Sequence, residues 1–180
     1  MAATQYADII QPPFGTGPNL MPGMSQVLYF IGVNDILSFG AVGTTEPEKY
    51  TIKTPITLKP GKRFSKMYSG IEKGQLKFEA LGGRDATGFK ITGTSFIPGD
   101  SNDLNYFTNE CQGDRFIVIM PRADGKMIMV GTENFPATMR AAHDSETVTG
   151  DASGYAVNIE AYSPYKYIYD AAVQLTATQA

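Results

Sequence analysis

The sequence predicts a mainly β protein, an antiparallel β-sandwich or barrel with one flanking α-helix and an extended N-terminal arm. Two strand-like apolar runs, residues 115–120 and 126–130, are joined through Asp124-Gly125. Asp-Gly at this place is a strong hairpin signal, because a two-residue type I′ turn needs positive φ at both central positions. Several other segments alternate with the period of two that strands have, and only one segment has helical periodicity.

Composition limits the classes of partner. The 180 residues suffice for one domain with a sizeable core, and a 42% hydrophobic content excludes disorder throughout. The net charge of −3 argues against tight binding of nucleic acid, which requires clustered Lys and Arg. The single cysteine, Cys111, cannot form an internal disulfide. Because an export signal and a long apolar run are both absent, we expect no membrane partner.

Residues 1–25 are expected to form the extended arm. Residues 11–25 hold four prolines and three glycines, which deny regular hydrogen bonding. The arm also carries Phe14, Leu20 and Met24, which are unusual in a solvated tail. Docking of the arm on something, including a neighbouring copy of the chain, is therefore an alternative to solvation.

A single β-sandwich domain is expected over residues 26–173. Its first strand is residues 26–32, after which Asn34 or Asp35 caps a short helical turn through Ile36 and Leu37. Residues 49–59 alternate between apolar and polar positions, and Pro55 within them predicts an edge strand or a bulge. Further strands are expected over residues 63–69, 74–81 and 88–97.

The helix is expected near residues 101–112. Asp100 or Ser101 can cap it, Leu104, Phe107 and Cys111 fall at three- and four-residue spacing, and Gly113 ends it. The hairpin and a polar loop over residues 141–154 follow. The last elements are strands at residues 155–162 and 165–169 and a polar C-terminal tail, 174–180.

No constellation of reactive side chains is evident. His143 lies beside Asp144 without a nucleophile nearby and is interpreted as a solvated loop residue, and Cys111 as a small core residue. The acids Asp144, Glu146 and Asp151 lack the spacing of a calcium loop. The sequence therefore predicts no catalytic residue, no cofactor site and no metal site, and we expect that the protein is not an enzyme.

Two surface patterns are of interest. Tyr165, Tyr167 and Tyr169 recur every second residue, which on one face of a strand is typical of a core or an interface and less often of glycan binding or base stacking. The densest basic stretch is too short for nucleic-acid specificity and is suited to pairing with acidic neighbours; it contains Lys59, Lys62, Arg63 and Lys66.

A series of short motifs resembles tail-tube-type structural proteins of phages and prophages from Bacteroidetes hosts. The resemblance extends over roughly residues 50–170. It lies in residues 57–65 (TLKPGKRFS), 72–79 (EKGQLKFE), 95–99 (SFIPG), 115–119 (RFIVI), Gly125, Val130-Gly131 and 135–139 (FPATM).

This resemblance implies a virion structural protein, assembled in the host cytoplasm, whose copies close into homo-oligomeric rings of usually six subunits. Stacked rings would form a tail tube that contacts other virion proteins and lets DNA pass without specific binding. The candidate assembly residues are Phe14, Leu20, Met24, Tyr165, Tyr167 and Tyr169. A neck, connector or capsid-associated protein, and a glycan-binding tail module that uses the tyrosines, remain alternatives.

Overall fold

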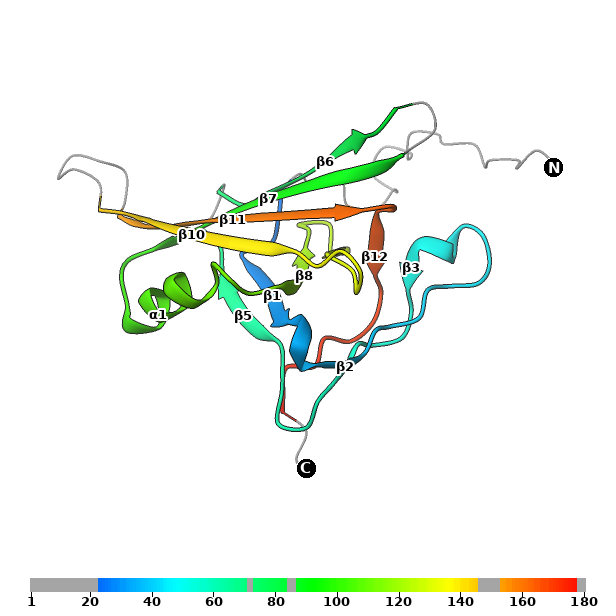
Figure 1. The fold of residues 1–180 in the computed structure, drawn as a ribbon, viewed down its shortest axis with the longest axis horizontal. Helices are drawn as coiled ribbons and strands as arrows, with labels where there is room; N and C mark the ends of the chain where they lie inside the picture. The colour runs from blue at the N-terminus through cyan, green and yellow to red at the C-terminus, as the bar shows by residue number, and fades with distance from the viewer. Residues whose placement is uncertain (1–22, 71–72, 84–86, 146–152, 178–180) are drawn as a thin grey trace.

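The computed structural model describes residues 23–70, 73–83, 87–145 and 153–177. The strands of this part form two main β-sheets and one smaller sheet (Figure 1). In spatial order, the six-stranded sheet consists of β3 (Thr51–Ile52), β12 (Tyr167–Tyr169), β9 (Met127–Val130), β8 (Phe116–Pro121), β1 (Val27–Gly32) and β5 (Ser65–Tyr68). The four-stranded sheet consists of β10 (Thr138–Asp144), β11 (Gly154–Ser163), β7 (Gly88–Pro98) and β6 (Gln75–Leu81). The small sheet pairs β2 (Ile36–Ser38) with β4 (Thr57–Leu58).

The predicted mainly β fold class is confirmed. Strand pairs are antiparallel except that of β12 and β3, which run parallel. One α-helix, α1 (Asn102–Glu110), lies within the described residues, together with short 3₁₀ turns at Val33–Asp35 and Glu48–Tyr50. Strands of the two main sheets run in clearly different directions, so the sheets cross as they pack (Figure 1).

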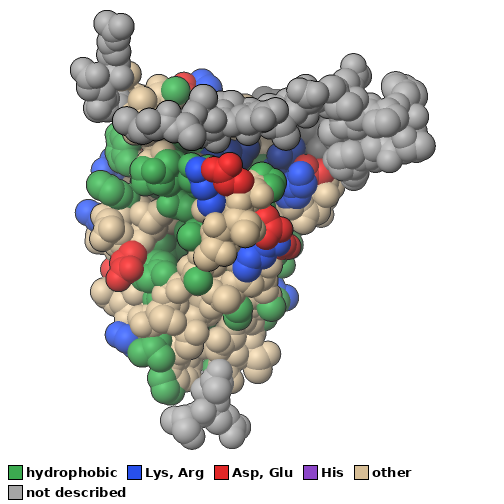
Figure 2. Space-filling view, turned by 90° about the vertical axis from the view of Figure 1, so that its right-hand side faces the viewer, with side chains coloured by type: hydrophobic (Ala, Val, Ile, Leu, Met, Phe, Trp, Pro, Cys, Tyr) green, Lys and Arg blue, Asp and Glu red, His purple; other side chains and the backbone are tan. Residues whose placement is uncertain are grey.

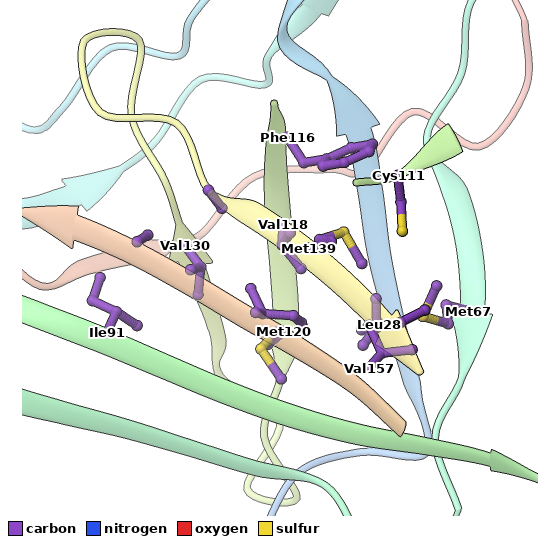
Figure 3. Packing of buried hydrophobic residues seen from close by; sticks show 14 of the residues in the cluster. Leu28, Met67, Ile91, Cys111, Phe116, Val118, Met120, Val130, Met139 and Val157 are labelled. Atoms are coloured by element: carbon purple, nitrogen blue, oxygen red, sulfur yellow. The ribbon is translucent and has the colours of Figure 1, made fainter. Parts of the chain in front are cut away.

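The first hydrophobic cluster fills the space between the two main sheets. Alternate residues of β8, β10 and β11 send their side chains into this space. Figure 3 shows Val118 and Met120 of β8 in this layer together with Met139 of β10 and Val157 of β11. All four of these side chains are buried, so the two sheets form a continuous core.

The opposite face of the six-stranded sheet is also covered. A second cluster contains Ile117 and Ile119 of β8, Tyr169 of β12, and Ile56 and Phe64 from segments outside this sheet. Because β8 sends alternate side chains into the two clusters, both of its faces are buried. A continuous apolar run such as that of β8 is typical of a strand buried on both faces, and here the cover comes from within the same chain.

The β8–β9 hairpin is confirmed, but its turn differs from the prediction. The strands pair with Pro121 opposite Met127, and Arg122 donates a backbone hydrogen bond to Lys126. The loop is therefore three residues long, with Gly125 at φ +85° donating to the carbonyl of Arg122. A type I turn followed by one residue in the left-handed conformation fits a loop of this length. The expected two-residue type I′ turn is therefore wrong, because the loop has one residue more.

Residues 49–59 do not form one strand. They are divided into a 3₁₀ turn, β3 and β4, with Pro55 in the irregular part between the two strands. Ile52, Ile56 and Leu58 are buried as the alternation predicted, whereas Tyr50 is exposed. Pro55 has no N–H to donate, and the residues beside it bond to other segments instead, as when the Thr54 hydroxyl accepts from the Ala41 N–H.

Three other boundaries of helical turns, strands and loops differ from the prediction. Ile36 and Leu37 belong to β2, so the helical turn before them ends at Asp35. The predicted polar loop over 141–154 begins later, because Ala141 to Asp144 continue β10 in register with β11. The predicted strand 165–169 is shorter and starts at Tyr167.

Helix α1 agrees closely with its prediction. The Ser101 hydroxyl accepts a hydrogen bond from the Leu104 N–H at 3.2 Å and caps the first turn. Leu104 and Phe107 pack against the first cluster, and Cys111 just after the helix is buried in it. The ring of Phe107 meets that of Phe30 edge to face at 5.4 Å, which holds the helix against β1.

The body of the protein extends beyond residues 26–173. Met24 packs against the first cluster, and Ser25 donates a backbone hydrogen bond to Pro121. At the other end the carbonyl of Gln174 accepts from Phe64, and Leu175 packs against the second cluster. The beginning of the expected C-terminal tail is therefore docked.

Candidate assembly surface

Strand β6 presents a long unpaired edge. It pairs with β7 along seven residues, and no other described strand pairs with it. The opposite edge of the same sheet is covered: the Gln112 amide donates to the Ala141 carbonyl of β10 at 3.1 Å, and Phe116 and Ala137 exchange two backbone hydrogen bonds of 2.8 Å. Exposed backbone donors and acceptors on a strand edge are a template for another strand.

The end strands of the six-stranded sheet are shorter. On β3, the Thr51 carbonyl accepts from Gly43 at 2.9 Å, so the outer edge of this strand is occupied. Among the strands that the structure describes, β5 pairs only with β1, along four residues. Among the described strands, β6 therefore offers the longest row of backbone groups for an added strand.

A cavity of about 310 Å³ lies beside β6, between the two main sheets. Leu76 and Phe78 of β6 form one wall, and Ile128 of β9 lies opposite. Lys166 lies at this cavity with its ammonium 5.2 Å from the centre of the Phe78 ring. Arg122 also lines it and pairs with Asp124 at 3.2 Å. The first cluster is thus incomplete on the β6 side, and cations flank the gap.

An open apolar groove of about 220 Å³ lies at the other end of β6. Three large side chains at this groove are exposed: Leu81 by 40%, Phe135 by 54% and Tyr162 by 48%. These side chains come from β6, from the segment before β10 and from β11. Large exposed apolar groups that gather at one place mark a surface suited to contact with another molecule.

Three tyrosines form an aromatic cluster. The Tyr165 ring lies 4.8 Å from that of Tyr50 and 6.1 Å from that of Tyr167, and the Lys49 ammonium lies 5.3 Å from the centre of the Tyr50 ring. Partial burial, followed by the nearby Tyr165 and Tyr50, raises the pKa of Tyr167. Figure 2 shows the side of the molecule that carries β3 and β12, where apolar side chains gather between charged ones.

The structure separates the predicted assembly residues. Tyr165 is exposed, Tyr167 is half-buried, and Tyr169 is a core residue whose hydroxyl accepts from the Ile56 N–H at 3.2 Å. The Tyr169 side chain is buried within its own chain, so its expected role as an assembly residue is not supported. Met24 is half-buried against its own chain, and Phe14 and Leu20 lie outside the described residues.

Leu81, Phe135 and Tyr162 were not singled out by the sequence. Leu81 ends an alternating strand at Gly82-Gly83, and Tyr162 ends another just before Ser163-Pro164. Large apolar residues at the ends of strands are a usable signal, but the groove they share depends on strand pairing across the sheet. The register between β7 and β11, which places Lys90 opposite Tyr162, is what brings these strand ends together.

The remaining candidate groups have structural surroundings. His143 lies exposed on β10, not in a loop, with its ring 4.7 Å from that of Tyr155. Burial raises the pKa of the Cys111 thiol, which fits a core residue. In the basic stretch between Lys59 and Lys66, the Lys62 ammonium forms an ion pair with the Asp35 carboxylate at 2.9 Å.

No group of three or more His, Cys, Asp and Glu side chains that could hold a metal ion occurs among the described residues, and Glu146 and Asp151 lie outside them. In the same ranges, no helix has the length and apolar character needed to cross a membrane.

Comparison with protein-family models, with curated proteins and with solved structures found no match for this chain.

Proposed function

We propose that the chain is a self-assembling virion structural protein, the subunit of a phage tail tube. In this proposal the copies close into rings of six, and stacked rings form a conduit for DNA within the virion. The single observation that carries self-assembly is the unpaired β6 edge beside an unfilled cavity. The choice of a tail tube follows the resemblance of the motifs between residues 50 and 170.

An unpaired edge favours assembly because its backbone groups gain hydrogen bonds when another strand adds to it. In this proposal a different part of the neighbouring copy covers the edge, so the contact is heterologous. Heterologous contacts close into rings when the rotation between copies allows it, and otherwise give open filaments. In rings that stack into tubes, other copies of the chain cover both the unpaired edge of β6 and the exposed groove.

Passage of DNA requires a wall that does not hold phosphate. The net charge of −3 disfavours retention of a polyanion. On the solvent face of the four-stranded sheet, Lys90 pairs with Glu160 and Lys77 with Glu79, each at 2.6 Å. Paired in this way, the lysines are less available to phosphate.

Negative-stain electron microscopy of the purified full chain, with light scattering for mass, tests self-assembly. We expect rings or tubes at high concentration. A substitution in the groove, Phe135→Ser, should reduce assembly, whereas Tyr106→Ser on the exposed face of α1 serves as the matched control. A strictly monomeric protein at high concentration would contradict the proposal. Assembly only with a partner ring would favour a neck, connector or capsid-associated protein.

A glycan-binding tail module is a second candidate, favoured by the aromatic cluster of Tyr50, Tyr165 and Tyr167. Exposed tyrosine rings can stack on the apolar faces of sugars. A glycan array should then give a signal that Tyr167→Ala abolishes and Tyr106→Ala retains, with circular dichroism unchanged in both. Absence of any signal from the unaltered chain would remove this candidate.

A further inference from the structure

The β6 side of the molecule combines an unpaired strand edge, an unfilled cavity and an ammonium group. No ion pair of Lys166 with an acid occurs among the described residues, and its ammonium lies over the Phe78 ring. We propose that residues 4–10 of a second copy add as a strand to β6, with Tyr6, Asp8 and Ile10 directed toward the cavity. This assignment rests on the proposed self-assembly and names the segment and the surface that perform it.

The N-terminal sequence suits strand addition. Prolines occur at positions 12, 13, 18 and 22, whereas residues 1–11 contain none. A strand that joins a sheet needs its N–H groups, so the proline-free part is the suitable one. Residues 4–10 also equal β6 in length.

The side chains of this segment match the cavity. In a strand, Tyr6, Asp8 and Ile10 share one face, so an acid lies between two apolar residues. Asp8 carries the only charged side chain before Gly23. The cavity offers apolar walls with the Lys166 ammonium beside them, and its volume equals that of roughly ten waters at about 30 Å³ each. Apolar side chains can therefore enter while Asp8 pairs with Lys166.

The connection is long enough to reach a second copy. Gly23 is fixed at the cavity, where its carbonyl accepts from Ala123 at 3.2 Å. Residues 11–22, with their four prolines, have a sequence that favours extended chain, and would reach about 37 Å if fully extended at about 3.1 Å per residue. The seven residues of β6 span only about 23 Å. A linker of this length can reach past the β6 strand of its own chain to the β6 strand of a neighbouring copy.

Disulfide trapping tests the assignment. One sample of the full chain carries Asp8→Cys and a second carries Lys166→Cys; the native Cys111 is buried and gives little background. Mixed under oxidising conditions, they should form an interchain dimer on a non-reducing gel. Its yield should exceed by at least about tenfold that of Asp8→Cys mixed with Lys59→Cys, because a bound segment raises the effective concentration of one thiol at the other.

The outcomes separate this assignment from the proposed function. Oligomers by light scattering, without a disulfide-linked dimer of the Asp8→Cys and Lys166→Cys chains, would overturn the strand addition and leave self-assembly standing. An intrachain disulfide in a chain with both substitutions, without dimer, would overturn the choice of a second copy. Monomers without any cross-link would overturn both proposals.

Charge exchange gives an independent test. Lys166→Glu should weaken self-association at least about tenfold by placing two acids together. Asp8→Lys in the same chain should restore it, and Lys66→Glu, at an exposed lysine on β5, should have little effect. Failure of the double substitution to restore association, with circular dichroism unchanged, would contradict the pairing of Asp8 with Lys166.

Discussion

At Tyr169 a single hydroxyl group joins two distant segments of the chain. It accepts from the Ile56 N–H at 3.2 Å and donates to the Ala172 carbonyl at 3.1 Å. Tyr169→Phe removes both bonds and leaves a buried N–H without its partner. We expect a loss of about 1–3 kcal/mol in the free energy of unfolding, measured by urea denaturation. Tyr165→Phe, at an exposed ring, is the control and should change it by less than about 0.5 kcal/mol.

The same residue predicts a dependence on alkaline pH. Burial raises the pKa of Tyr169 above its ordinary value of 10.0. The unfolded chain therefore loses this proton first as the pH rises, and stability falls from about pH 10 toward the folded pKa, by at most about 1.4 kcal/mol per pH unit. Tyr169→Phe should unfold with a shallower pH dependence in this range. An equal slope in both proteins would show that other groups control alkaline unfolding.

The tyrosine series also shows what a residue pattern can predict. The spacing correctly placed Tyr167 and Tyr169 on one face, since both pack on the second cluster. It could not distinguish an exposed face from a covered one. Tyr169 contacts Ile56, which is 113 positions away in the sequence, and no local period encodes that contact.

Among the elements, the β8–β9 loop depends on one glycine. Gly125 has φ +85°, and nothing lies within 4 Å of the position its Cβ would take. Gly125→Ala should therefore cost about 1–2 kcal/mol through backbone strain alone. Gly113→Ala, also in open space but without a positive φ, is the matched control and should be neutral or slightly stabilising. Equal effects on thermal unfolding would contradict the strain argument.

The helix offers a parallel case. Ser101→Ala should lower the free energy of unfolding by about 0.5–2 kcal/mol, because the Leu104 N–H loses its acceptor. Ser101→Asp retains an acceptor and should keep most of the stability. Chemical denaturation followed by circular dichroism measures both. A loss in Ser101→Asp equal to that in Ser101→Ala would argue against capping.

Elements were predictable where their signals are local. The cap at Ser101, the alternation in β6, β7 and β11 and the run in β8 follow from adjacent residues, and all of these elements are present. The segment 49–59 was predicted incorrectly because β3 and β4 pair with different sheets. The unpaired edge of β6 was equally beyond local reasoning, since an edge is defined by what the rest of the chain leaves uncovered.

On the scale of the whole molecule, β8 couples the two hydrophobic clusters. Ile119 and Met120 are neighbours in sequence, both buried, and point into opposite clusters. If the six-stranded sheet unites both clusters in one cooperative unit, truncating a buried side chain on either side of β8 must destabilise the entire fold. If the clusters are independent, each should unfold with its own midpoint.

We therefore expect Ile119→Ala and Met120→Ala each to lower the free energy of unfolding by about 2–5 kcal/mol. Urea titrations followed in parallel by far-ultraviolet circular dichroism and tyrosine fluorescence should give coincident transitions in both variants. Leu37→Ala, at a side chain that is 65% exposed, should stay within about 0.5 kcal/mol of the unaltered protein. Two separated transitions, with each alanine moving only one, would show that the clusters fold independently and that β8 does not join them.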